Sequence, residues 1–130
     1  MSYIPKYILK RMITADAVKA IPEGVEITAI NVISPTTVAE VPKEGVLDKV
    51  EFIIDGKPIS MEQKAKVKLT FGEKTVMANK LNDLEGTTLP VGGKIIFILP
   101  IQLNKGETHK FELKVNSNRP TNIEFERVVS

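Results

Sequence analysis

The feature that most constrains this chain is a two-residue alternation of apolar and polar side chains, which begins near residue 25. Residues 64–71 show it clearly, and residues 50–54 repeat it directly before Asp55-Gly56, the signal of a tight type I′ hairpin turn. Successive side chains of a strand point to opposite faces, so this pattern is typical of half-buried strands. The apolar members of the 64–71 run are Ala65, Val67, Leu69 and Phe71.

Turn signals recur about every ten residues, which predicts an antiparallel architecture. The segments VEFIIDGKPI and LNKGETHKFELKV resemble the strand–turn–strand segments of immunoglobulin-like modules. The sequence has neither cysteine nor tryptophan, so it lacks the Cys-Trp-Cys core of true immunoglobulin domains. The chain has 130 residues, the size of one domain. We therefore expect an all-β fold: a single antiparallel β-sandwich of immunoglobulin-like style, with seven to nine short strands, over residues 23–130.

Residues 1–22 differ from the rest and predict a short amphipathic helical segment packed on the domain. Its basic residues Lys6, Lys10 and Arg11 lie largely opposite its apolar ones, and Pro22 with Gly24 ends the region. The segment could close its own domain, dock onto a neighbour or lie on an anionic membrane. The candidate contact residues are Tyr3, Ile4, Lys6, Tyr7, Ile8, Lys10, Arg11 and Met12.

Composition excludes several chemistries. Without cysteine there are no disulfides, thiolate metal sites, iron–sulfur clusters or cysteine nucleophiles. The net charge is only +2 and aromatic residues make up 5%, so nucleic acid is an unlikely partner. We expect a cytoplasmic protein, and the abundance of Lys and Glu over Gln leans toward a thermophile.

Two polar groups are weak candidates for a site. His109 is the single histidine, so triads and most zinc sites would have to include it. Asp83 and Glu85 lie in a turn-rich connection over residues 79–93 and offer fewer oxygen ligands than a Ca²⁺ site needs. We interpret His109 as a structural or rim residue and assign no catalytic residue, metal or cofactor, so we lean against an enzyme.

Two further surfaces remain. The lysine row Lys64, Lys66 and Lys68 is either a solvated strand face or an anion surface. The run KIIFILPI, residues 94–101, is more apolar than one sheet face needs, which indicates burial on both faces or contact with another subunit.

These features favour a non-enzymatic binding or scaffolding module that acts through protein–protein contacts, with self-association as a homo-oligomer. The alternatives are a peripheral binder of anionic membrane surfaces, through the basic N-terminal segment, and a small-ligand or enzyme site around residues 79–93 with His109.

Overall fold

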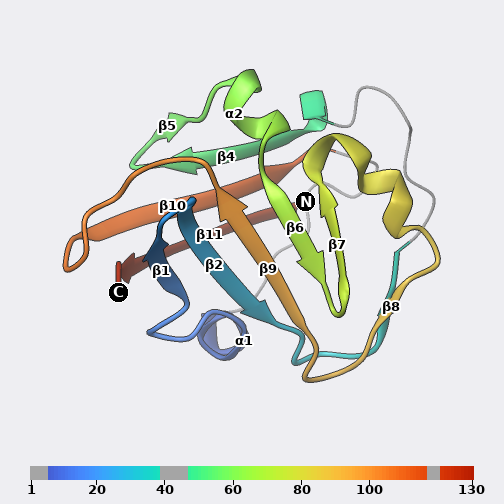
Figure 1. Ribbon diagram of the computed structural model, residues 1–130. Helices are drawn as coiled ribbons and strands as arrows, with labels where there is room; N and C mark the ends of the chain where they lie inside the picture. Colours follow the sequence, from blue (N-terminus) through green and yellow to red (C-terminus); the bar gives the residue numbers. More distant parts are fainter. Residues whose placement is uncertain (1–5, 39–46, 117–120) are drawn as a thin grey trace.

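The computed structural model describes residues 6–38, 47–116 and 121–130 (Figure 1). Within them the protein is mostly β, with eleven strands in three antiparallel sheets. Strands β1-β2-β9-β6-β7 form one sheet, β11-β10-β4-β5 a second, and β3-β8 a small third. The strands are β1 Val18–Ile21, β2 Gly24–Ile30, β3 Thr36–Thr37, β4 Val50–Ile54, β5 Lys57–Pro58, β6 Lys68–Phe71, β7 Lys74–Met77, β8 Thr88–Leu89, β9 Lys94–Leu99, β10 Thr108–Val115 and β11 Thr121–Val128.

The short helical elements are α1 Lys6–Met12, η1 Leu47–Lys49, α2 Met61–Ala65 and η2 Ala78–Leu84. No helix in the part of the chain that the structure describes is long and apolar enough to cross a membrane. The strand count exceeds the predicted seven to nine because three strands, β3, β5 and β8, contain only two residues each.

Strand β9 lies at the centre of the five-stranded sheet, paired with β2 on one side and β6 on the other. It comprises the first six residues of the apolar run 94–101. Phe97 and Leu99 point into the main core, and Leu99 is fully buried. The predicted burial on both faces is only half met, because Ile96 and Ile98 stay partly exposed.

The two larger sheets share one apolar core. Val25 and Leu99 from the five-stranded sheet belong to the same buried cluster as Phe52 and Phe111 from the four-stranded sheet. The rings of Phe52 and Phe97 meet edge to face, with centroids 5.7 Å apart. In Figure 1 the strands of one sheet cross those of the other.

Ser130 ties the two sheets together at one corner. Its backbone N–H donates to the Val18 carbonyl, and its carbonyl accepts from the Ala20 N–H, both at 2.9 Å. The edge strand β1 thereby gains partners from the end of the chain, and the residues after β11 are held beside it.

The hairpin predicted at Asp55-Gly56 is confirmed. Both residues have positive φ, 52° and 81°, as a type I′ turn requires, and they join β4 to β5. A second tight turn, at Gly72, joins β6 to β7. Asp55 is the one described non-glycine residue with positive φ.

Two element assignments were wrong. The helical segment expected for residues 1–22 ends at Met12 in the structure, and Val18–Ile21 form strand β1, because their backbone pairs with β2. The strand expected from residue 64 begins only at Lys68, because Met61–Ala65 form α2. The Ser60 side chain accepts from the Gln63 N–H, and the Gln63 side chain accepts from the Ser60 N–H, a capping box that starts this helix.

A substitution of Gly24, at the start of β2, tests how closely the backbone of β2 approaches that of β9. The φ of Gly24 is 146°, and an added Cβ would lie 2.0 Å from the Leu99 carbonyl oxygen, a backbone atom that cannot turn aside. Gly24→Ala should therefore destabilise the protein by about 3 kcal/mol or more in urea unfolding. Gly86→Ala is the control, because that Cβ meets no atom and only a left-handed φ opposes it, at about 1 to 2 kcal/mol. Equal losses would contradict the close approach.

Candidate functional site

Helix α1 is fixed to its own chain by the residue that follows it and by Arg127. Ile13 is buried, with 3% of its surface exposed. The Arg127 guanidinium donates to the Ile13 carbonyl at 2.5 Å and to the Thr14 carbonyl at 3.1 Å. It also lies over the Phe125 ring, 5.5 Å from the centroid. The end of α1 is therefore anchored on β11.

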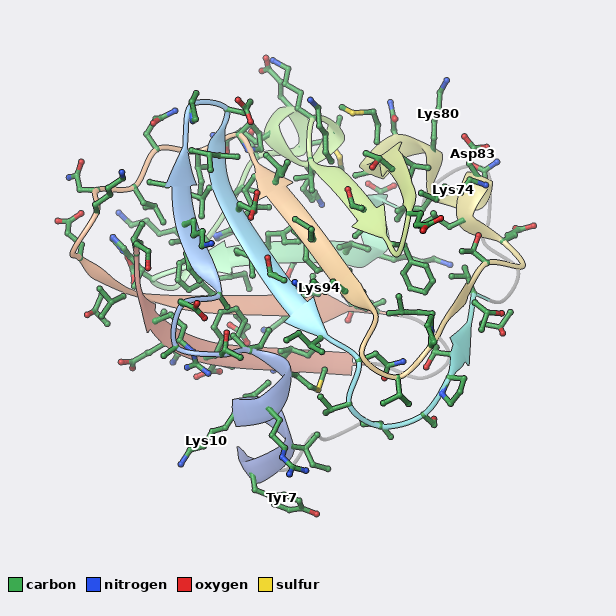
Figure 2. The ribbon with its side chains drawn as sticks, turned by 60° about the horizontal axis from the view of Figure 1, so that its bottom comes forward. Tyr7, Lys10, Lys74, Lys80, Asp83 and Lys94 are labelled. Atoms are coloured by element: carbon green, nitrogen blue, oxygen red, sulfur yellow. The ribbon has the colours of Figure 1, made fainter. Side chains whose placement is uncertain are left out.

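One side of α1 faces solvent. Tyr7 is 71% exposed and Lys10 and Arg11 are exposed, and Figure 2 shows Tyr7 and Lys10 pointing away from the body of the protein. Ile8 and Met12 are half-buried. Of the remaining predicted contact residues, Tyr3 and Ile4 lie outside the described residues, as does the side chain of Lys6.

His109 lies between two carboxylates at the start of β10. Its Nδ1 is 2.6 Å from Asp55 Oδ2, and its Nε2 is 3.5 Å from Glu107 Oε1. The hydrogen bond to Asp55 raises the pKa of His109 above its ordinary 6.5, and Glu107 adds to this. The same contact holds the pKa of Asp55 below 3.8, helped by the Lys110 N–H, which donates to Asp55 Oδ1 at 2.9 Å.

The structure does not bring His109 together with residues 79–93. Strand β10 begins at the left of Figure 1, whereas η2 lies at the right. Asp83 accepts a bond from Lys74 Nζ through its backbone carbonyl, and Glu85 is exposed. Over the described ranges no three acidic or histidine side chains are placed to hold a metal ion.

The three lysines at 64, 66 and 68 do not share a strand face, so that interpretation was wrong. Lys64 belongs to α2, is only 8% exposed, and donates from Nζ to the Val50 carbonyl at 2.9 Å. Lys66 caps that helix and lies 3.6 Å from Glu62. Only Lys68 projects from a strand, β6.

The solvent side of the five-stranded sheet is uncovered. Ile96 and Ile98 belong to neither core cluster, and no described helix crosses in front of β2 and β9 in Figure 2. Glu26, Ile98 and Lys68 form one row across the sheet, because Ile98 of β9 pairs with Glu26 of β2 on one side and with Lys68 of β6 on the other. We call this surface the outer face; its central residues are Glu26, Thr28, Ile96, Ile98, Lys68 and Thr70.

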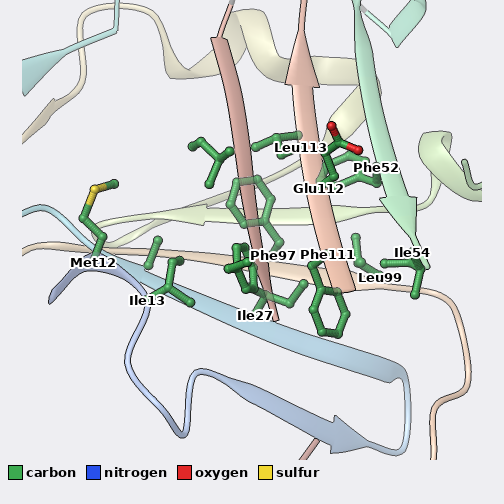
Figure 3. A pocket seen from close by; sticks show the side chains of 13 residues that line it. Met12, Ile13, Ile27, Phe52, Ile54, Phe97, Leu99, Phe111, Glu112 and Leu113 are labelled. Carbon is green, nitrogen blue, oxygen red and sulfur yellow. The ribbon is translucent and has the colours of Figure 1, made fainter. Parts of the chain in front are cut away.

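Two apolar pockets lie on the inner side of the same sheet. The smaller, of about 50 Å³, is shown in Figure 3, and Met12 and Ile13 form part of its lining. The larger, of about 330 Å³, is lined by side chains of β4, β6, β9, β10 and η2, with Val38 and Val67. Phe52, Phe97 and Leu113 contribute to both linings, so they form the wall between the two pockets.

The larger pocket is partly open to solvent, and its described lining is apolar. Protein interiors are close-packed, so apolar side chains around an unfilled space of about 330 Å³ lack packing contacts that a ligand would supply. Sequence reasoning could not find this pocket, because each lining residue is an ordinary core residue taken alone.

Arg127 should hold α1 in place. Arg127→Ala removes the donors to Ile13 and Thr14 and should lower stability by about 1 to 3 kcal/mol. Hydrogen exchange of residues 6–13 should accelerate more than that of β9. Arg11→Ala is the matched control, because that arginine is exposed on α1. Unchanged exchange in α1 of Arg127→Ala would contradict the anchoring role.

The His109–Asp55 pair should make stability depend on pH. The raised pKa of His109 means that its stabilisation is full below pH 6.5 and is lost as the pH rises through the folded pKa. The lowered pKa of Asp55 means that its share is present above pH 3.8 and is lost as the pH falls through its folded value. We expect the urea midpoint to decline on the alkaline side of pH 6.5, and His109→Asn to flatten that decline.

His109 offers a direct control for this prediction. It is the single histidine, so its ring resonances in an NMR titration need no further assignment. A folded pKa at or below 6.5 would contradict the pairing.

The sequence was also compared with known proteins. It matches no protein-family model and no curated protein. What the chain does is therefore inferred from the geometry of its own residues.

Proposed function

We propose that this protein is a non-enzymatic binding module that acts through protein–protein contacts, and that it self-associates through the outer face. The observation that carries the proposal is the apolar pair Ile96 and Ile98, which β9 leaves on the solvent side of the sheet. Ile98 lies between Glu26 on β2 and Lys68 on β6. No ion pair joins Glu26 or Lys68 to another side chain of the described part of the protein, and the row continues from Glu26 to its register partner Lys19 on β1.

The outer face is complementary to a second copy of itself. A two-fold axis parallel to β9, placed above the face, exchanges the two sides of each row. It sets Ile98 over Ile98, and it sets Glu26 of one copy over Lys68 of the other, because these residues share one row. Isologous contacts of this kind are the commonest interfaces in homo-oligomers.

A second candidate surface is the exposed face of α1. Tyr7 with Lys10 and Arg11 places an aromatic ring beside two cations on an anchored helix. This composition suits either an acidic protein partner or an anionic lipid surface.

We also propose that the two larger sheets form an antiparallel β-sandwich of immunoglobulin-like style. The shared core cluster and the Phe52–Phe97 contact support two layers. The sandwich would leave the outer face as the broad flat surface of one layer.

Charge exchange tests the self-association. Sedimentation should give the wild type a mass of twice the 14.4 kDa of the chain. Glu26→Lys should raise the dimer dissociation constant at least tenfold, because it sets lysines against each other. The double variant with Glu26→Lys and Lys68→Glu should restore association, since the row is again complementary.

Glu73→Lys is the control for net charge, because that residue lies in the β6–β7 turn away from the row. A monomeric wild type at moderate concentration would overturn the self-association, and equal effects of the Glu26 and Glu73 variants would overturn the choice of face.

Flotation with anionic vesicles distinguishes lipid binding through α1 from self-association through the outer face. If α1 binds lipid, wild-type protein floats with the vesicles at low salt, and the variant combining Lys10→Glu with Arg11→Glu does not. Failure of the wild type to float would exclude the lipid surface.

A further inference from the structure

The larger pocket between the sheets is an apolar site without an assigned occupant. The thirteen lining residues that belong to the described part of the chain are all apolar, and most come from the two large sheets and from η2. Leu81 and Leu84 place two side chains of residues 79–93 in its wall, whereas His109 has no part in it. This is independent of the outer face, which uses the opposite side of β9.

The lining decides the class of occupant. The described part of the wall has no charged or hydrogen-bonding side chain, so an ionised or strongly polar group buried there would remain unpaired. An apolar cavity of about 150 Å³ in another protein stays free of water and binds benzene. This pocket has about 330 Å³, room for a larger hydrocarbon.

We infer that this pocket binds a small neutral molecule that is mostly hydrocarbon, of a size between one and three aromatic rings. Burial of its apolar surface drives the binding. The Phe52–Phe97 wall, whose ring centroids are 5.7 Å apart, limits the pocket toward the smaller cavity.

Ala78 is the residue to alter. It is 5% exposed, it lines the pocket from the start of η2, and a larger apolar side chain there would take the space of a ligand. The probe is N-phenyl-1-naphthylamine, a neutral aromatic amine whose fluorescence rises in apolar surroundings.

Wild-type protein should enhance the fluorescence saturably, and saturating probe should raise its melting temperature. Ala78→Leu should raise the dissociation constant of the probe at least tenfold and should itself raise the melting temperature. Ala15→Leu, at an exposed position away from the pocket, should change neither. If Ala78→Leu does not fold, Leu81→Phe is the second variant, because Leu81 is only half-buried.

Three outcomes would overturn the inference. The first is no saturable enhancement by the wild type. The second is unchanged binding in folded Ala78→Leu or Leu81→Phe, above all if Ile98→Lys abolishes it, since the probe would then lie on the outer face. The third is a wild-type melting temperature that saturating probe does not raise, together with destabilisation by Ala78→Leu, which would mean that the chain itself fills the space.

Discussion

The alternation of side chains along β9 is the constraint on which the rest of the structure depends. Hydrogen-bonded pairing with β2 and β6 fixes this strand at the centre of its sheet. Alternate side chains of β9 therefore face the core and the solvent. Phe97 and Leu99 form part of the core shared with the four-stranded sheet. Ile96 and Ile98 are left on the outer face, where the energy of their burial is available only to a partner.

Asp55 shows how one turn residue can position a distant strand. Its backbone N–H donates to the Lys110 carbonyl at 2.8 Å, and its carboxylate accepts from the Lys110 N–H and contacts His109. A type I′ turn needs positive φ, which aspartate tolerates better than most residues. Asp55 thereby continues the antiparallel pairing of β4 with β10 by one residue and also forms the turn into β5.

The sequence predicts those parts of the fold that depend on local chemistry. The Asp55-Gly56 hairpin and the apolar strand at residues 94–99 follow from turn preference and hydrophobicity, and both are present. The errors also have local causes. Ser60 and Gln63 have the spacing of a capping box, which favours a helix directly before and within the residues where the alternation predicts a strand.

Strand β1 and the pockets could not be predicted in the same way. Val18–Ile21 are four residues whose pairing with β2 and with Ser130 decides their state, and no local signal outweighs the helical periodicity before them. The larger pocket arises because Phe71 and Leu84 at one end and Phe52 and Leu113 at the other line a space wider than their side chains fill. That width depends on how the two sheets cross, which is a property of the assembled chain and not of any segment.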